Sequence, residues 1–505
     1  MFCFIVSLGL YAQKHRVIDL ELQAVEYFDE FEFSKSLAAY QELEVLDSSL
    51  ITNEHAFNIG VCYMETYQYQ KALVYLEIAK NDQGHHHYYY AKALQLNYLL
   101  DEAIEQYKLY KDVLQKEGVD TKPIVEIDRE IRYCLVAKRL VAKPKEVEIS
   151  LLLSNINSKY DDYSPLVNSK DSIIYFTSDR YVGDKSHIHQ HDGTYLDNIF
   201  SVPFSSDTIH KAKLITELNS KHDDACVAIN HQGNQMIVFR SHNKNEINSS
   251  GGHLYWTGLV NGRWSKPQLL SVLKHSNSTE ISACFSVNDS TIYFTSDMEG
   301  GFGGEDIYKT FIQSNGTWSK PINLGSAINT EYDEDSPFIY PNGKELYFVS
   351  NGDNSMGGYD VFVTELKGGG YTRPKNLGYP INTVGDEFGA FVTGSDEIFF
   401  SDNRSWGVGE TDVYKAQKEP KPSEQVVRGF VVDNLIGHSY QIAVYNPKGE
   451  LLKVVASDEL TKKFFFFAPK ELNELKLVVS QIGEILLRTK ITLDGSTHEL
   501  KLIYN

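Results

Sequence analysis

The chain has 505 residues, of which 42% are hydrophobic and 12% aromatic, which is enough for packed cores in about three domains. Its net charge of −20 argues against non-specific binding to nucleic acid and to an anionic membrane surface, because both need a basic face. The five cysteines include no Cys-x-x-Cys pair, which argues against zinc and dithiol chemistry.

The N-terminal segment, residues 2–10, is apolar, and Ala12 and Gln13 are typical of the end of a secretory signal. No Lys or Arg precedes this run, and Leu10 stands where a small residue is preferred. We interpret residues 1–12 as a signal peptide whose basic start is missing, and therefore expect export to the periplasm or the periplasmic face of an outer membrane. The alternative is an ordinary buried segment. The run is too short to span a membrane.

Residues 13–143 are predicted to form helices, because apolar residues recur at intervals of three and four. Small residues also recur along this region, with Ser36, Ala72 and Ala103 close to 34 residues apart. The residues that carry the pattern are Ala24, Tyr27, Gly60, Tyr63, Ala72, Ala79, Ala91 and Ala103. The pattern resembles tetratricopeptide repeats, and the resemblance implies stacked helix pairs whose concave surface binds a peptide or protein.

One pattern occurs five times between Asp161 and Tyr414. An acidic pair opens each copy, a strand ending in Tyr-Phe-Thr-Ser-Asp or a variant follows, and an Asp-Ile-Tyr-like strand comes next. The centres of the middle strands, 63, 55, 54 and 52 residues apart, are Phe176, Phe239, Phe294, Phe348 and Phe400. A period near 50 with several short strands is typical of a β-propeller.

Four strands in each of the five copies predict a five-bladed propeller over residues 147–418. A six-bladed propeller would need a sixth copy whose sequence is too degenerate to be recognised. Residues 147–154 form a spare strand that could complete the last blade. Because a residue that recurs in each copy is needed by the blade, we interpret the repeated carboxylates as structural. They are Asp162, Asp179, Asp224, Glu280, Asp297, Asp306, Glu334, Asp360, Glu387, Asp402 and Asp412. The alternatives are acid–base catalysis by the strand-end aspartates and cation binding by the acidic pairs.

A polar linker at residues 418–422 precedes residues 424–505, which are predicted to form a small β-sandwich. Asn446-Pro-Lys-Gly449 is suited to a turn, and the run Phe464–Phe467 before Pro469 suits a strand of an antiparallel sandwich, although four consecutive phenylalanines are a hazard for edge pairing. We therefore expect a multidomain α plus all-β protein, with a helical array, a propeller and a sandwich.

The repeat, read here as Ile-Tyr-Phe-Thr-Ser-Asp at 292–297 and Gly-Gly-Glu-Asp-Ile-Tyr at 303–308, resembles the TolB-type propeller repeat. Residues 424–505 resemble a carboxypeptidase regulatory-like domain. This order of domains is similar to that of envelope proteins of Bacteroidota, some of which are associated with type IX secretion. Those proteins usually end in an OmpA-like domain, which would begin where this sequence ends, so peptidoglycan binding is not carried over.

Local catalytic motifs are absent from the sequence, including Gly-x-Ser-x-Gly, the phosphate loop and His-Glu-x-x-His. Peptidases with this type of propeller carry a hydrolase domain, for which no segment remains, so we expect that the chain is not an enzyme and needs no cofactor. His85, His86 and His87 resemble a metal tract, but consecutive residues of a helix point about 100° apart, so we expect them to begin a helix.

The sequence supports two functions of different classes. The first is a cell-envelope scaffold that binds protein partners, which are expected to be envelope or secretion components, through its helices and its propeller. The second is a ligand-binding module that holds a glycan or a cation in the propeller or the sandwich. Trp406, beside Gly407 and Gly409, is a candidate for stacking on a sugar, although we prefer the interpretation that it packs a loop.

Overall fold

The computed structural model describes residues 2–79, 84–119, 121–152, 155–168, 170–183, 195–204, 211–241, 251–273, 278–394, 397–432, 439–481, 483–493 and 499–503. Contacts divide the chain into a helical unit that extends to Leu135 and a strand-rich unit from Val136 onward. None of the helices described combines the length and the apolar character needed to cross a membrane.

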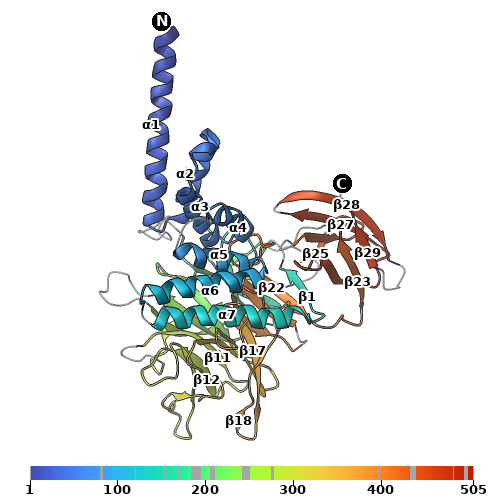
Figure 1. The fold of residues 1–505 in the computed structure, drawn as a ribbon. Helices are drawn as coiled ribbons and strands as arrows, with labels where there is room; N and C mark the ends of the chain where they lie inside the picture. Colours follow the sequence, from blue (N-terminus) through green and yellow to red (C-terminus); the bar gives the residue numbers. More distant parts are fainter. Residues whose placement is uncertain are drawn as a thin grey trace. The chain divides into compact units, whose positions relative to one another are not determined.

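The helical unit consists of helices that pack in chain order, α1 on α2, α3 on α4 and α5 on α6 (Figure 1). The expected leader, residues 1–12, falls mostly within α1. The helices are α1 (Phe2–Asp29), α2 (Phe33–Leu46), η1 (Ser48–Leu50), α3 (Asn53–Glu65), α4 (Tyr69–Ile78), α5 (His85–Leu96) and α6 (Leu100–Lys116). A further helix, α7 (Thr121–Val141), begins in this unit and ends in the next.

Small residues allow the paired helices to approach closely. A Cβ atom at Gly60 in α3 would lie 2.6 Å from Cγ of Leu76 in α4, so no larger residue fits without a shift. The alanines of the repeated pattern, Ala24, Ala72, Ala79, Ala91 and Ala103, are fully buried. Tyr63 is buried and Tyr27 half-buried.

The strand-rich unit contains five successive antiparallel sheets. The first is β2 (Asp162–Asn168), β3 (Ile173–Ser178), β4 (Asn198–Pro203) and β5 (Lys213–Leu214). The second is β6 (Asp224–Ile229), β7 (Gln235–Ser241), β8 (Gly252–Val260), β9 (Arg263–Trp264) and β10 (Gln268–Leu269). The third is β11 (Glu280–Phe285), β12 (Thr291–Ser296), β13 (Asp306–Phe311) and β14 (Ile322–Asn323).

The fourth sheet is β15 (Glu334–Ile339), β16 (Glu345–Ser350), β17 (Asp360–Lys367), β18 (Gly370–Tyr371) and β19 (Lys375–Asn376). The fifth contains β20 (Glu387–Val392), β21 (Glu397–Asp402) and β22 (Asp412–Gln417), and β1 (Glu148–Leu151) pairs with β22. The first strands contact one another in the order β2, β6, β11, β15, β20 and back to β2. This closed cycle of radial sheets is a β-propeller.

Strand register corrects two alignments made from the sequence. In the second sheet Asp224 pairs with Arg240, as Asp162 pairs with Ser178, so Val238 rather than Phe239 stands where the first sheet has Phe176. In the fifth sheet Asp402 pairs with both Glu387 and Asp412, which is the place of Ser178. Asp402 is therefore not the equivalent of Asp179. The shorter hairpin of this copy concealed the shift.

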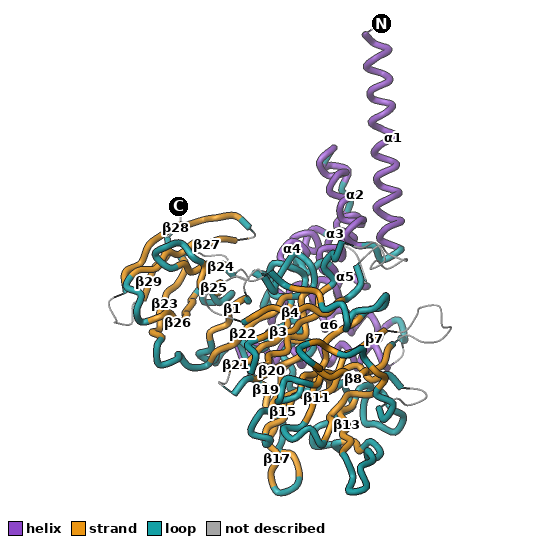
Figure 2. The backbone as a smooth tube through the Cα atoms, turned by 180° about the vertical axis from the view of Figure 1, so that it is seen from behind, coloured by secondary structure: helices purple, strands orange, loops and turns teal. Residues whose placement is uncertain are grey.

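The C-terminal strands continue the fifth sheet, because β1 pairs with β22 along one edge and with β25 along the other. Figure 2 shows the strands that follow β22 gathered around the C-terminus. They are β23 (Glu424–Val431), β24 (Gln441–Tyr445), β25 (Leu451–Ala456), β26 (Lys463–Pro469), β27 (Glu474–Gln481), β28 (Glu484–Thr492) and β29 (Glu499–Leu502). One sheet runs β1-β25-β24-β27-β28 and the other β26-β23-β29. Their buried side chains, including Phe464 and Phe466, form one core.

Buried charge reinforces the joint at β1. Glu148 is 1% exposed, and its carboxylate accepts hydrogen bonds from Nζ of Lys453 at 2.8 and 3.0 Å. The backbone N–H of Phe467 also donates to this carboxylate. The two strand assemblies are thus connected through one short strand.

Candidate functional site

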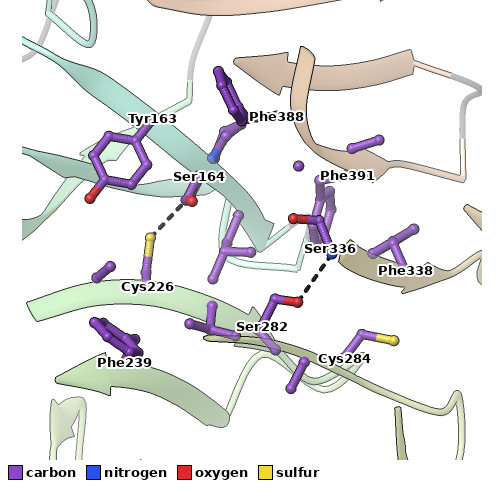
Figure 3. Close-up of a pocket in the computed structure, with 18 of the residues that line it drawn as sticks. Tyr163, Ser164, Cys226, Phe239, Ser282, Cys284, Ser336, Phe338, Phe388 and Phe391 are labelled. Atoms are coloured by element: carbon purple, nitrogen blue, oxygen red, sulfur yellow. Dashed lines mark hydrogen bonds between the residues drawn. The ribbon is translucent and has the colours of Figure 1, made fainter. Parts of the chain in front are cut away.

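A central cavity of about 450 Å³ lies between the first strands of the five sheets. Figure 3 shows the side chains that surround it. Each sheet contributes the stretch that follows its acidic residue, for example Ser164 in β2, Cys226 in β6 and Ser336 in β15. The cavity therefore depends on the closure of the whole ring.

A β-bulge in each first strand shapes the wall of the cavity. The register shifts once in β2, β6, β11, β15 and β20. At three of these bulges the backbone is left-handed, with φ of 51° at Ser164, 50° at Ser336 and 52° at Gly389. A left-handed residue other than glycine or asparagine is uncommon, and such bulges re-aim side chains at ligand sites.

Hydrogen bonds between neighbouring first strands hold these bulges. The thiol of Cys226 donates to the carbonyl of Ser164 at 3.0 Å, and the backbone N–H of Ser336 donates to Oγ of Ser282 at 3.1 Å (Figure 3). The backbone N–H of Cys226 donates to Oγ1 of Thr177 at 3.0 Å. Hydrogen bonds within the protein therefore fix the positions of these bulges without any ligand.

The cavity wall is largely aromatic and aliphatic. The rings of Phe338 and Phe391 lie 4.7 Å apart, and Phe388 is 40% exposed. Burial raises the pKa of the Cys226 and Cys284 thiols to about 12, so both stay protonated and act as small apolar groups.

Carboxylates gather near the end of the cavity at which the first strands begin. Asp161 and Asp335 line it. Nearby, burial raises the pKa of Asp197 to about 7, although a hydrogen bond from the Tyr163 phenol lowers it in part. Burial and the carboxylates of Asp335 and Asp333 raise the pKa of Glu305 to about 8. This end of the site therefore concentrates acidic groups, two of which titrate near neutral pH.

The second member of each acidic pair is buried and accepts hydrogen bonds from the loop before it. The backbone N–H and the hydroxyl of Ser158 donate to Asp162 at 2.6 and 2.8 Å. Ser220 donates in the same way to Asp224, and Ser278 donates through its hydroxyl to Glu280. The remaining two pairs are Thr330 with Glu334 and Thr383 with Glu387.

An asparagine just before this serine or threonine joins neighbouring sheets, and sequence reasoning missed it. Asn157 accepts from the N–H of Val413 at 2.7 Å and donates to the carbonyl of Val413 at 2.8 Å, joining the start of the first sheet to the fifth. The same contacts occur at Asn219, Asn329 and Asn382. The recurring motif Asn-Ser/Thr-x-x-Asp-Asp/Glu could have been found in the sequence by aligning the residues that precede the acidic pair of each copy.

The other carboxylates of the pattern cap backbone N–H groups. Asp179 accepts from the N–H of Asp161 at 2.9 Å, and Asp297 from the N–H of Thr279 at 2.7 Å. Three more accept from the glycine-containing turns that precede a third strand, namely Asp306, Asp360 and Asp412. Most of these carboxylates thus lie in the joints of the sheets and outside the cavity.

The remaining candidates do not line this cavity. His85, His86 and His87 begin α5 and contact different partners, the hydroxyl of Tyr110, the carbonyl of Leu76 and the side chain of Gln106. Trp406 is 7% exposed and packs against Tyr414, so it is not available to a sugar. Within the described ranges no group of three His, Cys, Asp or Glu is placed to hold a metal.

Fold and cavity together define a β-propeller protein whose first strands enclose a central cavity. No protein-family model and no curated protein matches the chain. Among solved structures, a TolB from Agrobacterium tumefaciens matches with 12% identity and a TM-score of 0.29, over 53% of this chain and 96% of its own. A glycoside hydrolase matches with 9% identity and a TM-score of 0.38, over 57% and 95%. An α-L-arabinofuranosidase from Lactobacillus brevis matches with 12% identity and a TM-score of 0.32, over 53% and 92%.

The prediction from the sequence that the chain is not an enzyme was wrong, because the sequence does not exclude an enzyme. The similar structures include the glycoside hydrolase, the arabinofuranosidase and a prolyl endopeptidase. The physical reason is that a propeller brings side chains of separate sheets together around its axis. Such a site has no local motif, and the absence of local motifs does not exclude it.

Proposed function

We propose that the protein is an exported scaffold of the cell envelope, in which a five-bladed propeller binds a protein partner at its central cavity. The observation that carries the proposal is the cavity of about 450 Å³ lined by the first strands of all five sheets. Its bulges are fixed by hydrogen bonds between strands, so binding would cost little ordering of the wall.

The chemistry of the cavity favours a polypeptide segment with an apolar body and a cationic group. Phe338, Phe388 and Phe391 offer apolar surface, while Asp161 and Asp335 supply negative charge at one end. We propose that the other repeated carboxylates serve the fold, because they accept hydrogen bonds from backbone N–H groups at the joints.

The helical unit supports a second contact of the same scaffold. We propose that it is a tetratricopeptide array, because its paired helices bury the small residues of the repeated pattern. Arrays of this kind offer a concave surface to a peptide or protein.

Cross-linking in the native cells, followed by affinity purification and mass spectrometry, tests the proposal. The variant Ile281→Trp places a large side chain on the cavity wall, and we expect it to reduce recovery of the partner at least about tenfold. Leu366→Trp, at an exposed position outside the cavity, is the matched control.

Equal recovery with both variants would contradict binding at the cavity. If calorimetric titration instead showed binding of an envelope glycan or calcium that Ile281→Trp abolishes, the site would belong to a small ligand and the scaffold proposal would fail.

A further inference from the structure

In three sheets the guanidinium of an arginine lies beside a buried carboxylate, a backbone carbonyl and an aromatic ring. In the first sheet the guanidinium of Arg180 lies 5.0 Å from the ring of Phe176 and 5.1 Å from that of Phe200. It also donates to the carboxylate of Asp162 and to the carbonyl of Ile156. The position therefore offers a buried carboxylate, a carbonyl oxygen and two aromatic faces.

The second and fifth sheets place a guanidinium in comparable surroundings, although Arg240 stands at the register of Ser178 and Arg404 bonds to Asp402 of the second strand. Arg240 donates to Asp224 at 2.6 Å and to the carbonyl of Leu218 at 3.0 Å, and lies 5.2 Å from the ring of Tyr255. Arg404 donates to Asp402 at 2.6 Å and to the carbonyl of Ile381 at 2.8 Å. Its guanidinium lies 5.2 and 5.3 Å from the rings of Phe400 and Tyr414.

The fourth sheet has the surroundings of this position without the arginine. Gly352 follows Ser350 by two residues, as Arg180 follows Ser178, and both serines pair with the first residue of the third strand. The rings of Phe348 and Phe362 are stacked at 5.9 Å, like those of Phe176 and Phe200 at 5.8 Å. Gly352 therefore leaves open the place that the other sheets fill.

A cavity of about 520 Å³ occupies this place, and its lining includes Glu334, Ile328, Phe348, Phe362 and Gly352. In the third sheet the corresponding residue, Met298, packs against the core. Among the five sheets, the fourth thus combines a glycine at this position with an open cavity.

The carboxylate in this cavity has hydrogen-bond donors but makes no ion pair among the described residues. Glu334 is 0% exposed and accepts from Thr330 and Ser350. It makes no ion pair with any residue in the described ranges. Burial raises its pKa to about 6, which shows that the carboxylate would gain from a nearby cation.

We propose that the fourth sheet is a receptor site for a guanidinium group, supplied by an arginine side chain of the protein partner. The inference rests on the scaffold function proposed above and names one group that the partner presents. Guanidinium is preferred over ammonium because its planar fork can donate to a carboxylate and a carbonyl at once while its face stacks on aromatic rings.

Short peptides test the chemistry directly. Full-length protein is titrated with acetyl-Gly-Arg-Gly-amide and with the same peptide carrying lysine or citrulline. We expect the lysine peptide to bind about tenfold more weakly and the citrulline peptide, which lacks charge, about a hundredfold more weakly. Equal affinity for the arginine and citrulline peptides would overturn the proposal.

Two variants locate the site. Gly352→Arg supplies the missing guanidinium from the chain itself, and we expect it to abolish peptide binding while raising the unfolding temperature. Gly352→Ala, whose Cβ would lie 3.2 Å from Oγ of Ser350, is the matched control that leaves the cavity open. Arginine-peptide binding by Gly352→Arg at the wild-type affinity would contradict the assignment.

A third variant keeps the inference falsifiable if Gly352→Arg does not fold. Arg180→Gly should open the same kind of site in the first sheet, lower the unfolding temperature and raise the peptide stoichiometry from one to two. Addition of the arginine peptide should restore part of the lost stability, and no restoration would count against a guanidinium site.

Arg373 also lines the cavity, so its own guanidinium is the competing occupant. If Arg373→Ala binds the arginine peptide and the unaltered chain does not, the site is filled internally and the proposal fails.

Cross-linked recovery of the partner separates this inference from the scaffold function. A partner recovered equally by the wild type and by Gly352→Arg would leave the scaffold standing and remove the arginine contact.

Discussion

Asn157 shows how one side chain can hold a ring closed. It donates to the carbonyls of Leu152 and Val413 and accepts from the N–H of Val413, which lies 256 residues away in the sequence. Its side chain therefore extends β22 much as a further strand would. Asn219, Asn329 and Asn382 do the same between sheets that follow one another in the chain, where a covalent connection already exists.

The variant Asn157→Ala should destabilise the propeller by about 2–3 kcal/mol, because it leaves buried backbone groups of β22 without a partner. Asn315→Ala is the control, since Asn315 lies in an exposed turn and its side chain accepts from the N–H and the hydroxyl of Thr317 in that turn. Urea denaturation followed by tryptophan fluorescence measures both. A loss for Asn157→Ala no larger than that for the control would show that the ring closes without this contact.

Individual residues were the hardest scale to predict from the sequence. The buried acid of each copy could be recognised in the sequence because it recurs. The residues that contact it in the fold could not be recognised, because they lie elsewhere in the chain. Asp402 was placed one residue out of register because its hairpin is shorter, and only strand pairing shows that it faces Glu387 and Asp412. The bulges at Ser164 and Ser336 depend on neighbouring strands and have no local signal beyond a serine.

At the scale of elements, the short strand β1 has the greatest influence on the architecture. It pairs with β22 in the propeller and with β25 beyond it, so both of its edges are used. The Glu148–Lys453 pair lies beside this joint and is mostly buried. Removal of one member of a buried ion pair leaves a charge without compensation.

We expect Glu148→Ala to destabilise the strand-rich unit by about 3–5 kcal/mol, because the ammonium of Lys453 would remain buried alone. The double variant Glu148→Gln with Lys453→Met should recover most of this loss, since glutamine keeps an acceptor for the N–H of Phe467. The exposed pair of Glu146 and Arg428 is the control, and Glu146→Ala should cost less than about 1 kcal/mol. Similar losses for Glu148→Ala and Glu146→Ala would refute the role given to the buried pair.

Element types were predictable from the sequence because their periods are strong. Repeated strands indicated the propeller, and intervals of three and four indicated the helices. The continuity of the sheet through β1 was only half predicted. A spare strand at residues 147–154 was expected to complete the last blade. Its pairing with β25 along the other edge could not be predicted, because the partner residues lie about 300 positions later in the sequence. Glu148 and Lys453, for example, are 305 residues apart.

At the scale of the whole molecule, buried carboxylates make stability depend on pH. Burial raises the pKa of Asp197 and of Asp412 to about 7, while an unfolded aspartate has a pKa of about 3.9. Between these values the folded state binds more protons than the unfolded state. The free energy of unfolding must therefore fall as the pH rises from about 4 to about 7.

We expect a higher unfolding temperature at pH 5 than at pH 8, with a slope of up to about 1.4 kcal/mol per pH unit for each such group. Asp412→Asn should flatten this dependence, because it removes one titrating group. Asparagine fits the position, since Asn198 begins the third strand of the first sheet as Asp412 begins that of the fifth. Scanning calorimetry across this range is the measurement, and stability that rises toward pH 8 would contradict the assignment.

During synthesis of the chain, β1 is made long before either of the strands that pair with it. The ribosome makes Leu151 long before Tyr414, its partner in β22, and longer still before Val454, its partner in β25. Until then both edges of β1 remain open, although all four of its residues are buried in the final protein. The ring can close only late, and a nascent chain that stalls between these points would carry an unpaired strand at the start of a half-built propeller. We therefore expect the nascent chain to depend on a chaperone until this four-residue strand is paired.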